Sequence, residues 1–197
     1  MQKAKQYRAL AREQLGGGIF AKNWLLALVC VLIFTGINAV LAYTLVGTFL
    51  FNSFLLFGIF TCFLSVARGQ KETYAIVDMF AGKNNIGSLI KLSLVKNIFL
   101  LLWAIVPIAG IIKPYSYAMV EYIKVDHPEY TAKEAITESR RMMNGYKWKL
   151  FCLELSFIGW LIVGMCCLGV GTYWVSAYMY AAKANFYNDL KKVYEAA

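Results

Sequence analysis

The chain has 197 residues, of which 60% are hydrophobic, and its 20 Lys and Arg outnumber 11 Asp and Glu, giving a net charge of +9. No polar stretch is long enough for a separate soluble domain, so the composition predicts a single all-α membrane domain over residues 1–197. In a soluble protein such an excess of basic residues would indicate nucleic-acid binding. Here the basic residues flank apolar segments and form no basic-aromatic module. We therefore expect anionic lipid headgroups, and no nucleic acid, as the partner.

Residues 1–18 predict an amphipathic helix that is followed by a glycine hinge. Apolar residues recur at helical spacing from Ala4 to Leu15, and the basic side chains lie mostly off that face. Such a helix is suited to lie in the lipid headgroup region, and the alternative is a solvated helix with a flexible hinge. The hinge consists of Gly16, Gly17 and Gly18.

Residues 24–67 contain no charged side chain, and this length suffices for two membrane spans because about 20 apolar helical residues cross a bilayer. We expect the first span at residues 24–43 and the second at 47–67, joined by a short uncharged turn. Asn38 and Asn52 are amides within these spans, where hydrogen bonding between helices explains them. Residues 70–91 then predict a loop with one short interfacial helix around residues 76–80.

The remaining apolar segments allow two main arrangements. In the first, a third span at 88–106 turns at Val106 and Pro107 and a fourth returns through about residue 125. Residues 147–167 and 171–188 are then the fifth and sixth spans. In the second, residues 92–112 and 155–180 are single spans, giving four in total, and five spans are also open.

Six spans, paired as three hairpins, keep every outer turn short and uncharged. They also put all basic residues except Lys113 on the inner side or at its boundary. The positive-inside rule therefore favours six spans, with both termini cytoplasmic and the chain multi-pass in the cell membrane.

The fourth span, within the hairpin of residues 88–125, should be irregular. Its expected helix breaks are Pro107, Gly110 and Pro114. Irregular backbone at membrane depth persists only where it packs against protein or lines a wet cavity. We therefore expect this span to be kinked and interior.

Residues 131–145 predict a second amphipathic helix. Thr131 and Glu134 have the spacing of a capping box, and Asn144 with Gly145 indicates the end of the helix. The fifth and sixth spans, within residues 147–188, follow it.

Three ionisable residues lie within the expected spans, where such groups are functional hypotheses. Glu154 is expected to pair with Lys113, to line a proton or cation path, to reach the interface or to bond a neighbouring serine. Lys113 is expected to meet a lipid phosphate or a carboxylate in a wet cavity, or to form a structural ion pair. Glu121 is expected at the interface, near the inner end of the fourth span.

The other basic residues flank the spans, and we expect them to form a collar that engages anionic lipid on the cytoplasmic side. The members of this basic collar are Lys3, Lys5, Arg8, Arg12, Lys22, Arg68, Lys71, Arg140, Arg141, Lys147 and Lys149.

Several stretches of the chain are similar to a bacterial family of integral membrane proteins catalogued as domain of unknown function 975. They are IIKPYSYAM at 111–119, AKEAITES at 132–139, MNGYKWKLF at 143–151, LSFIGW at 155–160 and NFY at 185–187. More distantly, this pattern resembles the membrane domain of some glycerophosphodiesterases. The chain departs from the family by its very short connection after the first span. The resemblance implies a membrane fold and no activity.

The sequence offers no catalytic constellation, no metal site and no cofactor motif, and its one histidine, His127, precedes a proline in a loop. We expect no disulfide, because all five cysteines lie in or at the ends of apolar segments and the adjacent pair Cys166 and Cys167 would be strained. The expected function is a non-catalytic membrane-embedded binding or scaffold protein. The alternative is a transporter or efflux component with a midplane site around Lys113 and Glu154. A second copy of the chain or a membrane partner protein is the other partner that we consider.

Overall fold

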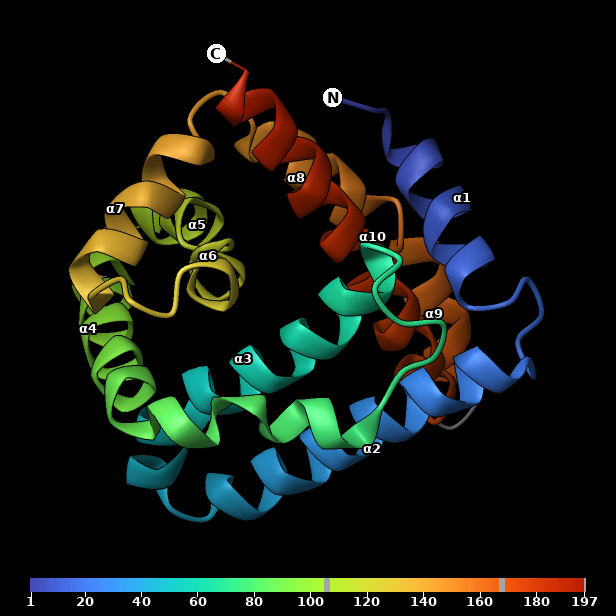
Figure 1. Ribbon diagram of the computed structural model, residues 1–197, viewed down its shortest axis with the longest axis horizontal. Helices are drawn as coiled ribbons and strands as arrows, with labels where there is room; N and C mark the ends of the chain where they lie inside the picture. The colour runs from blue at the N-terminus through green and yellow to red at the C-terminus, as the bar shows by residue number, and fades with distance from the viewer. Residues whose placement is uncertain (105–106, 167–168, 197) are drawn as a thin grey trace. The chain divides into compact units, whose positions relative to one another are not determined.

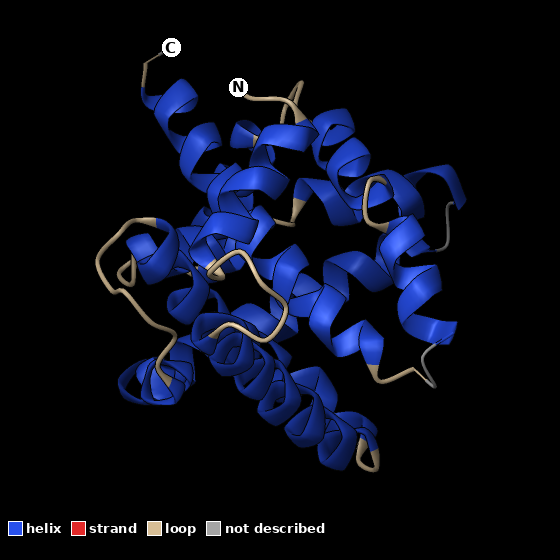
Figure 2. Ribbon diagram, turned by 90° about the vertical axis from the view of Figure 1, so that its right-hand side faces the viewer, coloured by secondary structure: helices blue, strands red, loops and turns tan. Residues whose placement is uncertain are grey.

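The computed structural model describes residues 1–104, 107–166 and 169–196, and within these ranges the chain forms helices and no strand (Figure 1, Figure 2). The elements in chain order are α1 Ala4–Gln14, α2 Lys22–Ala42, α3 Leu45–Ala67, the 3₁₀ helix η1 Ile76–Asn85, α4 Ile86–Ala104, α5 Pro107–Ser116, α6 Val120–Asp126, α7 Ala132–Met142, α8 Lys147–Leu155, α9 Ile158–Cys166 and α10 Gly171–Glu195. The expected all-α fold class is confirmed.

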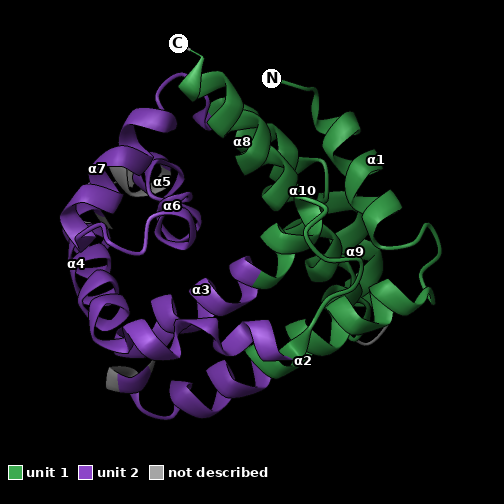
Figure 3. Cartoon of the chain, viewed as in Figure 1, with its two compact units in different colours: residues 1–34, 62–76, 148–197 green, residues 35–61, 77–147 purple. Residues whose placement is uncertain are grey.

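The chain divides into two compact units (Figure 3). Unit 1 comprises residues 1–34, 62–76 and 148–197, and unit 2 comprises residues 35–61 and 77–147. Helices α2 and α3 each contribute residues to both units.

Four helical segments within the described residues are long and apolar enough to cross a membrane: Lys22–Ala42, Phe49–Ala67, Ile76–Trp103 and Lys147–Cys166. Many of their outward side chains are apolar, as Val40 of α2 and Leu101 of α4 illustrate with about two thirds of their surface exposed. Exposed apolar surface on this scale is costly in water and favourable in lipid. These segments correspond to the expected spans one, two, three and five, and they indicate a membrane protein.

The expected fourth and fifth spans are each interrupted. Residues 107–126 form two helices, α5 and α6, which are separated at residues 117–119. Pro114, one of the expected helix breaks, lies inside α5. At a rise of about 1.5 Å per residue neither helix alone crosses a ~30 Å bilayer. The fifth span divides into α8 and α9 at residues 156–157. The expected turn at Val106 and the end of the fifth span at Cys167 lie outside the described residues.

The loop after α3 is shorter than expected. It ends at residue 75, η1 begins at Ile76, where the short helix was expected, and α4 follows η1 directly at Ile86. Gly58 of α3 explains why η1 lies close to this helix, since a Cβ at Gly58 would overlap the carbonyl group of Met79. The missing side chain therefore permits contact between the two backbones.

In unit 1, the apolar face of α1 packs against α10. Tyr7, Ala11 and Leu15 are buried, and the ring of Tyr7 meets that of Phe186 edge to face at 5.4 Å. The protein itself covers this face, and the expected position of the helix in the lipid headgroup region stays a prediction. Positive φ angles at Gly16 and Gly17 end the helix, as the glycine hinge predicts.

The break between α8 and α9 is stabilised by α1. Arg8 donates from Nη1 to the carbonyl oxygen of Ser156 at 3.1 Å, and Phe157 is buried with its ring perpendicular to that of Tyr178. The Tyr178 hydroxyl in turn donates to the carbonyl oxygen of Arg8 at 2.8 Å. Arg8 thus satisfies backbone that the interruption leaves unpaired.

In unit 2, α7 begins with the predicted capping box. The Thr131 hydroxyl accepts from the Glu134 amide, and the Glu134 carboxylate accepts from the Thr131 amide at 2.7 Å. The apolar face of α7 packs against α4 and α6, and Ser139 donates to the carbonyl oxygen of Ser116 at 2.8 Å. Gly145, with a φ of 80°, follows the end of the helix as predicted.

Candidate functional site

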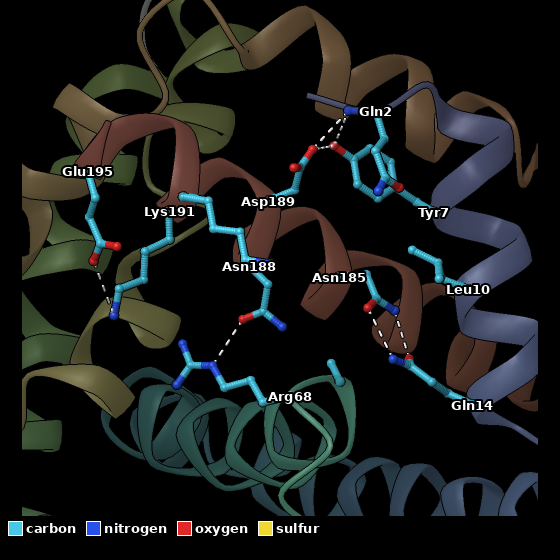
Figure 4. A pocket seen from close by; sticks show the side chains of 12 residues that line it. Gln2, Tyr7, Leu10, Gln14, Arg68, Asn185, Asn188, Asp189, Lys191 and Glu195 are labelled. Atoms are coloured by element: carbon cyan, nitrogen blue, oxygen red, sulfur yellow. Dashed lines mark hydrogen bonds and ion pairs between the residues drawn. The ribbon is translucent and has the colours of Figure 1, made fainter. Parts of the chain in front are cut away.

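A polar cavity of about 550 Å³ lies in unit 1, lined by α1, the end of α3 and the C-terminal half of α10 (Figure 4). The polar residues of α10 that face it recur every three or four positions, so that one stripe of the helix carries Asn185, Asn188, Asp189 and Lys192. The cavity therefore lies where a long helix changes from an uncharged N-terminal half to a polar C-terminal half.

On the side of α1, a hydrogen-bonded cluster fixes the cavity wall. The Asp189 carboxylate accepts from the Tyr7 hydroxyl at 2.5 Å and from the Gln2 amide at 2.8 Å (Figure 4). Gln14 and Asn185 exchange two amide hydrogen bonds, at 2.7 and 3.1 Å. Burial raises the pKa of Asp189, but the hydrogen bonds from Tyr7 and Gln2 outweigh it and the pKa is lowered. Burial and the neighbouring Asp189 raise the pKa of Tyr7 well above its usual value.

On the side of α3, Arg68 brings a guanidinium into the cavity. Its Nε donates to the Asn188 side chain at 3.0 Å (Figure 4). Its Cζ lies 6.0 Å from the centre of the Tyr187 ring. Lys191 forms a loose ion pair with Glu195 at 3.8 Å, and Lys192 also lines the cavity. With Asp189 engaged by Tyr7 and Gln2, cations outnumber carboxylates, and the guanidinium and ammonium groups suit a phosphate or carboxylate.

In unit 2, a buried ion pair joins α4 to α6. Lys96 and Glu121 are in direct contact, with side-chain exposures of 9% and 2%. Ser53 of α3 donates to the same Glu121 oxygen at 3.4 Å, and its amide lies 3.4 Å from the Ser93 hydroxyl. Lys96 accounts for the burial of Glu121, because a carboxylate this deeply buried persists only with a partner charge. The expected depth of Glu121 at the membrane interface stays a prediction.

The two residues of the expected midplane site have partners within their own units. Glu154 forms an ion pair with Lys183 of α10 at 2.6 Å. The Lys113 ammonium lies 3.9 Å from the centre of the Trp103 ring, a cation–π geometry. A pair between Lys113 and Glu154 would join different units and stays a prediction.

The other predicted residues occupy varied surroundings. Asn38 and Asn52 are half-buried, and Gly110 lies inside α5. The exposed members of the basic collar are Lys3, Lys5, Arg12, Lys22, Lys71, Arg140, Arg141 and Lys149. The half-buried members are Arg8, Arg68 and Lys147.

Two sets of residues were missed by the sequence analysis, although their spacing signals them. Ser93, Lys96 and Asn97 lie at positions i, i+3 and i+4 of an apolar helix, which places them on one face. The same spacing joins Asn185, Asn188 and Asp189 on α10. A polar stripe on a long apolar helix therefore indicates a buried network, and the partner helix cannot be read from spacing.

Comparison with known proteins supports the family resemblance. The model of the family described as Protein of unknown function (DUF975) matches residues 105–194, a range that includes α5 to α9 and nearly all of α10. No curated protein and no solved structure matches the chain. The distant resemblance to the membrane domain of some glycerophosphodiesterases stays a prediction. Over residues 105–194, the chain is therefore similar to the DUF975 family of proteins of unknown function.

Proposed function

We propose that the protein is a non-catalytic membrane-embedded binding protein that holds anionic lipid headgroups in the polar cavity of unit 1. The observation that carries the proposal is the joint presence there of Arg68, Lys191 and Lys192, of which Arg68 belongs to the basic collar. An anionic headgroup offers phosphate oxygens that match a guanidinium fork, and the exposed collar residues would attract the anionic leaflet.

The proposal includes six spans, with both termini cytoplasmic and the chain in the cell membrane. The fourth span would consist of α5 and α6, the fifth of α8 and α9, and the sixth of residues 171–188, within α10. This threading would put the collar next to the cytoplasmic leaflet. A reporter fused after His127 that is active only in the cytoplasm would be active under this threading, and activity of an externally active reporter would contradict it.

The headgroup test uses dioctanoyl phosphatidylglycerol, an anionic lipid, and dioctanoyl phosphatidylcholine, which is zwitterionic. Added to the protein in a nonionic detergent, the anionic lipid should raise the unfolding temperature more, because it binds only the folded state. Arg68→Gln should reduce this difference. Lys71→Gln should keep it, because Lys71 is exposed and does not line the cavity. Equal responses of the Arg68 variant and the wild type would refute the proposal.

Transport is the second candidate, and the Lys96–Glu121 ion pair favours it, since ionisable groups in apolar helices mark ion pathways. The partners of Glu154 and Lys113 weigh against the midplane site expected there, because each charge is already engaged. Proton flux into proteoliposomes, read by an enclosed pH-sensitive dye, should be present and lost in Glu121→Gln if transport is correct. Absence of flux in the wild type would exclude proton transport.

A further inference from the structure

A second cavity of unit 1 is separate from the polar one and is lined mostly by apolar side chains. It encloses about 430 Å³ and is bounded by α9, the beginning of α10, Trp24 of α2 and residues 19–20. Ligand pockets typically span about 300–1,000 Å³, so a hydrocarbon chain fits within this volume. Its aromatic lining includes Trp160, Trp174 and Tyr178.

One wall of this cavity is backbone held in close contact. Gly164 of α9 and Gly171 of α10 both line it, and a Cβ at Gly164 would lie 2.9 Å from the carbonyl carbon of Gly171. The two helices therefore touch without side chains between them. Backbone held in this way cannot collapse into the space, so the cavity is preformed.

Two polar groups accompany these apolar walls. Among the described lining residues Arg12 alone is charged; it is exposed, and its Nε donates to the Gly17 carbonyl oxygen at 3.1 Å. Trp24 is 5% exposed, and its indole N–H is buried without a hydrogen-bond partner. Since buried donors are almost always paired, the indole N–H lacks an acceptor that a ligand could supply.

The segment beside the cavity also indicates lipid. Ile19 and Phe20 line the cavity, lie outside any helix, and are 56% and 74% exposed. Two adjacent exposed apolar side chains in a connection are unfavourable in water and are typical of segments that insert into a bilayer.

We infer that this cavity binds an acyl chain of an anionic phospholipid. The chain lies along the tryptophans, Arg12 pairs with the phosphate, and the Trp24 indole donates to a headgroup or ester oxygen. The inference rests on the proposed function for its class of ligand, but it assigns a different cavity and different residues. A neutral or zwitterionic lipid would fill the same apolar space with a weaker attraction to Arg12.

Tryptophan fluorescence tests this inference, because bromine atoms on a bound acyl chain quench nearby indoles. The protein in nonionic detergent is titrated with phosphatidylglycerol carrying brominated chains, and separately with brominated phosphatidylcholine. We expect saturable quenching by the anionic lipid at lower concentration than by the zwitterionic one, reversed by unbrominated phosphatidylglycerol. Arg12→Gln should raise the half-maximal concentration about fivefold, the value of one ion pair. Lys5→Gln, an exposed basic residue of the same helix outside the cavity, should leave it unchanged.

A second variant tests the cavity itself. Val163→Phe adds ring volume to the wall and should lower the maximal quenching by both lipids. The inference would be overturned if both lipids quenched equally and Arg12→Gln had the same half-maximal concentration as the wild type. That result would indicate only unspecific lipid around the protein. Arg68→Gln separates the two proposals: it reduces the headgroup effect on unfolding and leaves the quenching in place. Loss of quenching in Arg68→Gln, with Arg12→Gln unaffected, would assign lipid binding to the polar cavity alone.

Discussion

Breaking the buried ion pair of unit 2 should destabilise the protein strongly. Replacement of Glu121 by Leu leaves the Lys96 ammonium, with a side-chain exposure of 9%, without its carboxylate. Removal of one partner from a buried pair costs about 3–5 kcal/mol, most of which is the penalty of the uncompensated charge. Ser53→Ala should cost about 1 kcal/mol or less, because its bond to Glu121 is long, at 3.4 Å.

A double-mutant cycle separates the pair from its surroundings. Lys96→Met, Glu121→Leu and the double variant are compared in mixed micelles with a rising fraction of denaturing detergent, and helix content is followed by circular dichroism. The double variant should be more stable than the sum of the single effects predicts, with a coupling of about 0.5–3 kcal/mol. Lys91→Gln, an exposed position of the same helix, is the control. Additive single effects would show that the two charges do not stabilise each other and would refute the reasoning.

Three further predictions concern local contacts. Asp189→Asn or Tyr7→Phe should increase hydrogen exchange in α1, since each weakens a charge-assisted hydrogen bond worth about 1.5–3 kcal/mol. Because the pKa of Asp189 is lowered, its contribution to the free energy of unfolding should be complete above the ordinary aspartate pKa of about 3.9 and be lost as the pH falls below it. The Asn variant should lack this loss of stability. Gly58→Ala should lower the unfolding temperature, because its Cβ would overlap the Met79 carbonyl, and an unchanged temperature would contradict that contact. Thr131→Ala should cost about 1 kcal/mol in denaturant unfolding, whereas Thr131→Ser should retain most of the cap.

Signals that act within a few residues allowed much of the fold to be predicted. The uncharged run 24–67 yields α2 and α3 nearly at the expected bounds, and the Thr131 capping box begins α7. The positive φ angles of Gly16 and Gly145 lie where the sequence indicates the ends of α1 and α7. These features depend on local hydrophobicity, capping and backbone freedom, which sequence carries directly.

Contacts between distant segments could not be predicted in the same way. The break at residues 156–157 contains no proline or glycine, and Arg8, far away in sequence, satisfies its backbone. Glu121 occurs near the end of an apolar stretch, and the approach of Lys96 from another helix offsets the free-energy cost of burying its carboxylate. The polar cavity is likewise lined by residues of α1, α10 and the end of α3. Among these lining residues, the sequence analysis singled out only Arg68.

The internal partners also change the charge argument for membrane topology. The positive-inside rule concerns basic residues exposed to the aqueous phase, and four of those counted are engaged within the protein. Lys96 and Lys124 are buried, Lys113 lies over Trp103, and Lys183 pairs with Glu154. Removing Lys113 from the count removes the single exception to six spans. Four spans would still leave residues 113–149 outside with four exposed basic residues, namely Lys133, Arg140, Arg141 and Lys149. The corrected count therefore still favours the six-span threading, with no basic residue on the outer side against four for the four-span threading.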